Sequence, residues 1–237
     1  MKTLLLVDDR LPLLATLEPI LKHWGYRVLT ATDIDQANAF LTGSVPALLI
    51  IGNKLARQPG LQQLPAGLTV LNLEHPEAVA EKTDPKMTLD VPVDIFALFA
   101  LIQSQVEKHP RRNLRLRLNL PGMYRTKGED FILADVLSLS REGLFFRSPL
   151  RLAAGDQISA VLPLLGHRKE IEVEGTVLYV IEPSPQNGYV QGFGLGFSSL
   201  SPQQLPLLER FIEESFLNEV AASQPGVGNF CTKQIKR

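Results

Sequence analysis

The chain has 237 residues, a formal net charge of −1, and 45% hydrophobic against 21% charged residues. This is the composition of a globular protein, long enough for two domains of about 100–150 residues each. The balanced charge excludes the overall basic field of a nucleic-acid-binding protein, so we expect no nucleic-acid partner. A single cysteine, Cys231, excludes an internal disulfide and a cysteine-rich zinc site.

The first residues, MKTLLLVDDR, contain an apolar run that Asp8 and Asp9 interrupt early, so the run is too short for a signal peptide. No apolar run reaches the roughly 18 residues that a membrane-spanning helix needs. We therefore expect no membrane span and a cytoplasmic protein. The four histidines are far apart in sequence, and no pair has the spacing of metal ligands. We expect no resident metal ion and no cofactor.

Residues 2–106 alternate between the patterns of buried strands and of helices. The strands are expected at 3–7, 26–31, 47–51 and 68–73, and the helices at 11–23, 33–43 and 92–108. Short, nearly all-apolar strands in series with helices predict a parallel sheet with right-handed crossovers. The first half is therefore expected to be an α/β domain.

The pattern changes after Pro110, where LRLRLNL (114–120) alternates strictly between apolar and polar residues. Further strands are expected at 130–140, 143–148, 156–164, 169–181 and 188–197. Short strands separated by turn signals predict an antiparallel sandwich or a small barrel. An amphipathic helix is expected at 202–220, and the aperiodic residues 221–237 are expected to form a flexible tail.

The first half, with KTLLLVDDR, a helix, GYRVLTA and PALLII, resembles the receiver domain of the response regulators of bacterial two-component systems over residues 1–108. The resemblance implies a flavodoxin-like fold, and Asp8 and Asp9 match the acidic pair that helps receivers to hold Mg²⁺. The phosphoryl-acceptor position is Gly52, and the conserved lysine position is Val91. The hydroxyl position falls near Asn72 or Leu73. We therefore interpret the half as a pseudo-receiver in which Asp8 and Asp9 are a residual acidic pair without a resident metal.

The apolar stripe of the expected helix 92–108 has two explanations. The first is packing on the sheet of its own domain. The second follows from the resemblance, because receivers commonly use their last helix as a dimer or partner surface. A homodimer through the receiver-like domain and an unidentified protein partner are both expectations from this resemblance.

The second half resembles a PilZ domain over residues 109–220, through RRNLRLRLNLPGMYR, VLSLSREGLFF, GTVLYV and GFGLGFSSLS. Arg111 and Arg115 match the family's two arginines with three residues between them. Ser140 and Gly143 match its second motif, in which Ser138 replaces the usual Asp or Asn. The resemblance implies an antiparallel β-barrel with a C-terminal helix, and it implies that the domain binds the bacterial messenger cyclic di-GMP. The candidate ligand-binding residues are Arg111, Arg112, Arg115, Ser138, Ser140 and Gly143.

The chemistry of these residue types suits that ligand, which has two phosphates and two guanines. A guanidinium group binds phosphate oxygens in a bidentate manner, stacks on purines, and pairs with guanine O6 and N7. Ser138 accepts fewer hydrogen bonds from a guanine than a carboxylate would, so the affinity is expected to be weaker than with Asp. Gly143 lets a ligand approach the backbone without a Cβ in the way.

These features predict a signalling effector rather than an enzyme, in which cyclic di-GMP binds at the linker and the barrel and changes the domain arrangement and partner binding. The first alternative is a ligand-free adaptor whose two halves bind only proteins. A phosphorylation-dependent regulator is a second alternative, against which Gly52 and Val91 argue. A hydrolase of the dinucleotide is a remote third, because the second half contains no metal-binding cluster of carboxylates or histidines.

Overall fold

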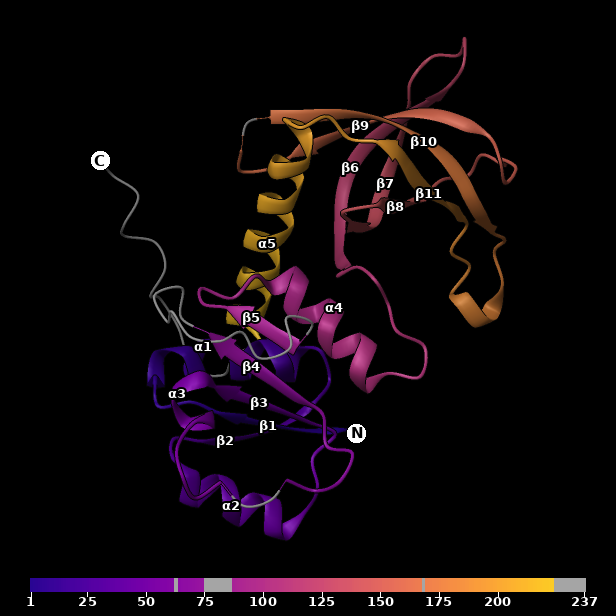
Figure 1. Ribbon diagram of the computed structural model, residues 1–237. Coiled ribbons are helices and arrows are strands. Elements are labelled where there is room, and N and C mark those ends of the chain that lie inside the picture. Colours follow the sequence, from indigo (N-terminus) through magenta and orange to yellow (C-terminus); the bar gives the residue numbers. More distant parts are fainter. Residues whose placement is uncertain (62–63, 75–86, 168, 224–237) are drawn as a thin grey trace. The chain divides into compact units, whose positions relative to one another are not determined.

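The computed structural model describes residues 1–61, 64–74, 87–167 and 169–223, so Cys231 and residues 224–237 of the expected tail lie outside the described residues. The chain divides into two compact units (Figure 1). Of the described residues, the first unit contains those of 1–112 and 217–223, and the second contains those of 113–216. None of the described helices is both long enough and apolar enough to cross a membrane.

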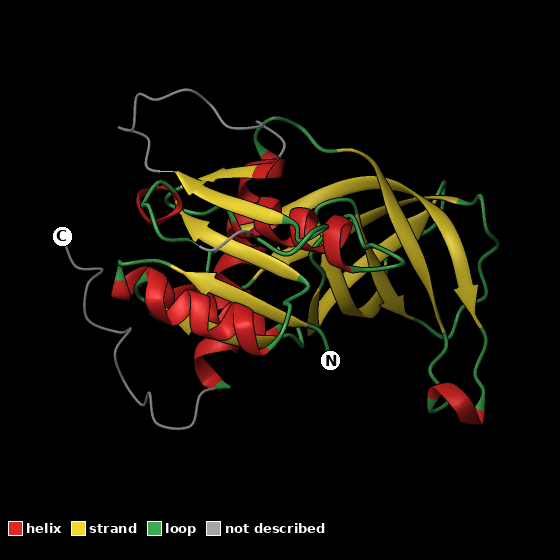
Figure 2. Cartoon of the chain, turned by 60° about the horizontal axis from the view of Figure 1, so that its bottom comes forward, coloured by secondary structure: helices red, strands yellow, loops and turns green. Residues whose placement is uncertain are grey.

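The first unit is an α/β domain, as predicted, built on a five-stranded sheet in the order β2-β1-β3-β4-β5. All of its strand pairs are parallel, and Figure 2 shows the strand arrows pointing the same way with helices beside them. Its elements in chain order are β1 (Thr3–Val7), α1 (Leu11–His23), β2 (Arg27–Ala31), α2 (Ile34–Gly43), β3 (Leu48–Gly52), α3 (Asn53–Ala56), β4 (Val70–Glu74), β5 (Thr88–Asp90) and α4 (Ile95–Val106).

Two hydrophobic cores lie on opposite faces of this sheet. Because successive strand residues face opposite sides, Leu4 and Leu6 enter one core while Leu5 and Val7 enter the other. Residues of α1 and α4 complete the first core, and residues of α2 and α3 complete the second. Burial on both faces explains why β1 and β3 consist almost entirely of aliphatic residues.

Two elements of this unit were not predicted from the sequence. The three-residue β5 buries only Leu89, and the four-residue α3 buries only Leu55. Neither is long enough to show a period of two or of 3.6 residues, so periodicity could not reveal them. The expected helix 92–108 begins later, at Ile95, where the side chain of Asp94 accepts a hydrogen bond from the Phe96 amide and caps the helix.

The second unit is a closed antiparallel barrel in the order β10-β11-β8-β7-β6-β9, followed by a helix. The sequence did not distinguish an antiparallel sandwich from a small barrel, and the structure is a closed barrel. Its elements are β6 (Leu116–Thr126), β7 (Ile132–Ser140), β8 (Gly143–Arg147), β9 (Gln157–Leu164), β10 (Lys169–Ile181), a 3₁₀ helix (Pro185–Asn187), β11 (Gly192–Ser199) and α5 (Gln204–Ala222). The expected helix 202–220 is thus shifted by two residues.

Closure of the barrel depends on its longest strand. The 13-residue β10 pairs with β9 over Lys169–Thr176 and with β11 over Glu174–Ile181. A strand that changes partners along its length turns the sheet around a corner, and β-bulges in its ladder with β11 increase the local bend. The barrel interior is aromatic, with the fully buried rings of Tyr124, Phe146 and Phe193 within 5.0–5.5 Å of one another between centroids.

A polar network anchors the chain at the end of α4, just before the second unit begins. Glu107 accepts a hydrogen bond from Lys2 Nζ at 3.0 Å and another from the Tyr26 hydroxyl at 3.0 Å. The Gln103 side chain donates to the Tyr26 hydroxyl and accepts from the Arg111 amide. The bond from Lys2 is the main reason that the pKa of Glu107 is lowered from its ordinary value of 4.5. The segment that follows α4 is therefore bonded to the residues that directly precede β1 and β2.

We expect Glu107→Gln to lower the free energy of unfolding in a pH-dependent way. A carboxyl group with a lowered pKa in the folded state stabilises it above the unfolded pKa, and that contribution disappears as the pH falls through the lowered value. The difference between wild type and variant should therefore be full at pH 7 and should shrink below about pH 4.5. Urea titrations followed by the fluorescence of Trp24, the only tryptophan, measure it. A difference that does not change with pH would contradict the network.

Candidate functional site

The acidic pair of the first unit lies at the carboxyl end of β1 and is occupied by cationic side chains of the chain itself. Asp8 is 1% exposed, and its two carboxylate oxygens each accept a 2.7 Å hydrogen bond from the Arg10 guanidinium. Asp9 forms an ion pair with Lys54, whose hydrogen bond is the largest cause lowering the pKa of Asp9. The bond to Asp8 likewise raises the pKa of Arg10. Both carboxylates are therefore neutralised without a metal ion.

Gly52, which the resemblance to receivers aligns with the phosphoryl acceptor, has no room for a side chain. A Cβ there would lie well inside 3.0 Å of the Asp8 carboxylate. The pocket at this edge also contains Lys54 and Arg57, so its charge is not that of a divalent-cation site. Within the described ranges, no group of three or more His, Cys, Asp or Glu side chains could hold a metal ion. The residues at this edge do not fit Mg²⁺.

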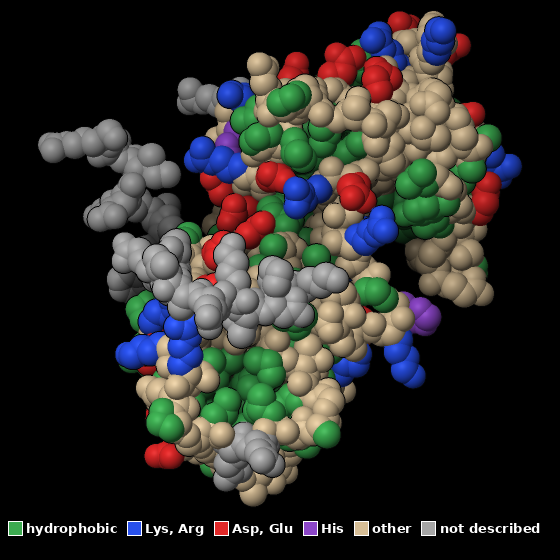
Figure 3. All heavy atoms as spheres, in the orientation of Figure 1, with side chains coloured by type: hydrophobic (Ala, Val, Ile, Leu, Met, Phe, Trp, Pro, Cys, Tyr) green, Lys and Arg blue, Asp and Glu red, His purple; other side chains and the backbone are tan. Residues whose placement is uncertain are grey.

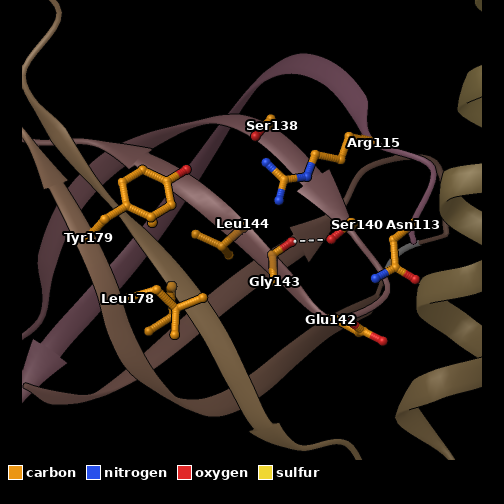
Figure 4. Close-up of a pocket in the computed structure, with 11 residues that line it drawn as sticks. Asn113, Arg115, Ser138, Ser140, Glu142, Gly143, Leu144, Leu178 and Tyr179 are labelled. Carbon is orange, nitrogen blue, oxygen red and sulfur yellow. Dashed lines mark hydrogen bonds between the residues drawn. The ribbon is translucent and has the colours of Figure 1, made fainter. Parts of the chain in front are cut away.

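A second pocket lies on the barrel, within the second unit (Figure 4). Its cavity volume is about 120 Å³, and it is partly open to solvent. Four of the six predicted ligand residues line it: Arg115, Ser138, Ser140 and Gly143. Its other lining residues are Asn113, Glu142, Leu144, Leu178, Tyr179, Gly194 and Leu195.

Strand alternation places the polar side chains of this pocket. Arg115 is exposed between the buried Leu114 and Leu116, so its side chain leaves the barrel core and enters the pocket. Figure 4 shows its guanidinium extended between Ser138 and Gly143. Ser138 and Ser140 are two residues apart on β7 and therefore face the same side.

The two-residue turn between β7 and β8 is held closely against β11. The Ser140 hydroxyl donates to the Gly143 carbonyl at 3.0 Å across the turn, and Ser140 is 5% exposed. A Cβ on Gly143 would lie well inside 3.0 Å of the Leu195 carbonyl oxygen. Glycine is required here by the approach of β11, which is a structural reason beyond the ligand access that the sequence suggested.

The apolar side of the pocket was not predicted. Leu178 and Tyr179 are neighbours on β10, yet both are exposed, at 61% and 41%. A register shift between Val177 and Tyr179 interrupts the alternation there, as β-bulges do near functional sites. Figure 4 shows both side chains opposite Arg115. The break of alternation in TVLYVI was a signal that sequence reasoning could have used.

Glycines of β11 make room for this apolar side. A Cβ on Gly194 would overlap the Tyr179 ring, and one on Gly196 would press against Leu178. The Tyr179 ring also stacks on Phe145, with centroids 6.3 Å apart and an interplanar angle of 20°. The motif GFGLGF thus supports two exposed apolar side chains beside a guanidinium group.

The other two predicted residues, Arg111 and Arg112, do not line this pocket. They belong to the first unit, and the pocket begins with the next residue, Asn113. Both arginines are exposed, and the Arg111 amide donates to Gln103 as described above.

The pocket therefore combines a guanidinium group, two hydroxyls and an aromatic ring with a glycine-rich backbone. A guanidinium group binds phosphate oxygens, and a partly exposed aromatic ring can contact a planar base. Figure 3 shows basic and acidic side chains interspersed over the face that it draws, so attraction of an anion depends on local groups rather than on a broad positive field.

Comparison with protein families gives one match, in which residues 106–214 match the model described as PilZ domain. This segment is a PilZ domain. The comparison with curated proteins finds no significant match. No family match covers the receiver-like half, so its resemblance stays a prediction.

Solved structures similar to the chain include three that match with 18–21% identity and TM-scores of 0.38–0.41. The inhibitor of motility MotI/DgrA of Bacillus subtilis aligns over 47% of this chain and 53% of its own (TM-score 0.41, 18% identity). The PilZ domain of YcgR from Escherichia coli, solved with c-di-GMP, aligns over 49% and 100% (0.38, 18%). The complex of MrkH from K. pneumonia with c-di-GMP aligns over 47% and 53% (0.39, 21%). The chain thus spans about half the length of MotI/DgrA and MrkH.

We expect Gly52→Asp to destabilise the first unit without creating a phosphorylation site. The new carboxylate would overlap and repel the buried Asp8, and overpacking of this kind typically costs about 1–3 kcal/mol. Urea unfolding followed by Trp24 fluorescence measures the loss, and intact mass after incubation with acetyl phosphate and Mg²⁺ tests for labelling. A phosphoryl group on wild type or variant would contradict our account of this edge.

Proposed function

We propose that the protein is a cyclic di-GMP-binding signalling effector whose ligand site is the barrel pocket together with the arginine segment before it. The observation that carries the proposal is the convergence of Arg115, Ser138, Ser140 and Gly143 on one pocket of a PilZ domain. These residues come from two separate stretches of the chain, and a purely structural role does not require an exposed guanidinium group beside the β7–β8 turn.

The ligand's chemistry assigns a task to each part of the pocket. Arg115 binds a phosphate or stacks on a guanine from its position just before β6, and Ser140 supports the turn beside it, because its hydroxyl already donates to the Gly143 carbonyl. Ser138 contacts a guanine edge. Arg111 and Arg112, on the linker before the barrel, would contribute further guanidinium groups to the same ligand.

The receiver-like half serves as a docking module in this proposal. Its acidic pair is neutralised by Arg10 and Lys54, so its state does not depend on phosphate. Closure of Arg111 and Arg112 on a ligand at the barrel would change the arrangement of the two units and thereby the binding of a protein partner. The signal thus enters through the dinucleotide alone.

Calorimetric titration of the full chain with cyclic di-GMP tests the site. We expect wild type to bind at micromolar or lower concentration and Arg115→Ala to bind about 10- to 100-fold more weakly, because one charge-assisted hydrogen bond contributes about 1.5–3 kcal/mol. Ser138→Asp should bind more tightly, since a carboxylate accepts two hydrogen bonds from one guanine edge. Arg111→Ala and Arg112→Ala, each titrated alone, measure how much each linker arginine contributes to the affinity.

Arg151→Ala is the matched control, because Arg151 is an exposed arginine of the same unit that does not line the pocket and pairs with Glu182. It should bind as wild type does. No heat from folded wild type would overturn the proposal and would favour the ligand-free adaptor. Equal binding by wild type and Arg115→Ala would place the ligand elsewhere.

Small-angle scattering of the full chain tests the change in arrangement. We expect the curves with and without saturating cyclic di-GMP to differ for wild type, and to coincide for the Arg111→Ala, Arg112→Ala double variant if that variant is saturated through Arg115. Identical curves for saturated and ligand-free wild type would contradict the rearrangement but not the binding.

A further inference from the structure

The turn that joins β7 to β8 carries two residues of the candidate site and is tied to α5. Ser140 and Gly143 flank the turn residues Arg141 and Glu142. The Arg141 side chain is absent from the pocket lining and forms an ion pair with Glu209 of α5 at 2.5 Å. These two side chains are only 35% and 29% exposed, so the pair is partly shielded from solvent.

The same turn is fixed on its other side by β11. The Phe197 amide donates to the Glu142 carbonyl at 2.8 Å, and Gly143 pairs with Gly196 in the ladder. The backbone of the turn is bonded to β11, and the Arg141 side chain is paired with α5. A movement of the turn relative to α5 would therefore strain or break the Arg141–Glu209 ion pair. The neighbouring residue in the helix, Leu208, is fully buried, so the helix cannot easily move at Glu209.

Helix α5, which contains Glu209, also contains the point at which the chain leaves the second unit. The chain enters the second unit at Asn113, a pocket residue, and leaves it after Phe216, inside α5. One covalent connection between the units is thus adjacent to the candidate site, and the other leaves from the helix whose Glu209 is paired with its turn.

We propose that Glu209 is a positioning residue for the ligand-binding turn and that the Arg141–Glu209 pair transmits ligand binding to α5. The inference rests on the proposed function, since it concerns what cyclic di-GMP at Ser140 and Gly143 does to the rest of the chain. The pair holds the turn in the geometry that binds phosphate, and ligand binding in turn stabilises the helix over residues 204–216.

The test combines calorimetry with hydrogen–deuterium exchange of the full chain, with and without cyclic di-GMP. In wild type we expect ligand to slow exchange in peptides from 204–216. Glu209→Gln and Arg141→Gln should each bind about 2- to 5-fold more weakly, the range for a partly exposed ion pair, and should lose the ligand-dependent slowing in α5. The double variant should be no weaker than either single variant, because both remove the same interaction.

Glu214→Gln is the matched control. Glu214 is a carboxylate of the same helix that pairs with Arg210 and His167 and not with the turn. It should keep wild-type affinity and the wild-type exchange response, and thermal unfolding of each variant checks that the helix is intact.

Three results would overturn the inference. Wild-type affinity and exchange response in Glu209→Gln would exclude the pair as a link, and equal losses in Glu209→Gln and Glu214→Gln would show a general weakening of α5. Additive losses in the double variant would show that the two residues act separately. Absence of binding by wild type would instead overturn the proposed function, on which the inference rests.

Discussion

The second unit depends on the close approach of β11 to its neighbours, where glycines stand at the points of contact. A Cβ on Gly143 or Gly192 would overlap the backbone of the adjoining strand, and one on Gly194 would overlap the Tyr179 ring. Larger residues would push β11 away from β8, which would open the barrel at the turn that carries Ser140. The same glycines leave the space in which Leu178 and Tyr179 cross β11. Barrel closure and pocket shape therefore follow from one steric constraint.

In the first unit, the acidic pair at the carboxyl end of β1 is neutralised by cationic side chains of the chain itself. A buried carboxylate needs partners, and Asp8 obtains them from the guanidinium and amide of Arg10, two residues away. Lys54 of α3, which follows β3, balances Asp9. The missing side chain at Gly52 is part of the same arrangement, since Asp8 lies where that side chain would have to be. The carboxyl end of β1 is therefore internally neutral and closely packed.

Much of this fold could be predicted because burial leaves a clear period in the sequence. The aliphatic runs of β1 and β3 predicted a parallel sheet, and the alternation of LRLRLNL predicted the antiparallel half. The barrel could not be distinguished from a sandwich by that alternation, because both bury one face of each strand, and the choice depends on how β10 divides its pairing between β9 and β11. The short β5 and α3 left no period to detect.

The candidate site was only partly predictable for a related reason. Motif positions located Arg115, Ser138, Ser140 and Gly143, since these residues are close in sequence to the strand ends that hold them. Tyr179 and Leu178 reach the pocket through a bulge, which interrupts the regular alternation from which their direction would be inferred. The Arg141–Glu209 pair joins residues far apart in the chain, and no local pattern predicts it.

The central claim is that one pocket on the barrel binds cyclic di-GMP, and a crystal structure of the full chain with this ligand tests it most directly. The account predicts ligand density over the β7–β8 turn, with a phosphate or guanine against the Arg115 guanidinium and a base near Ser138 opposite Tyr179. Density at another surface, with this pocket empty at saturating ligand, would contradict it.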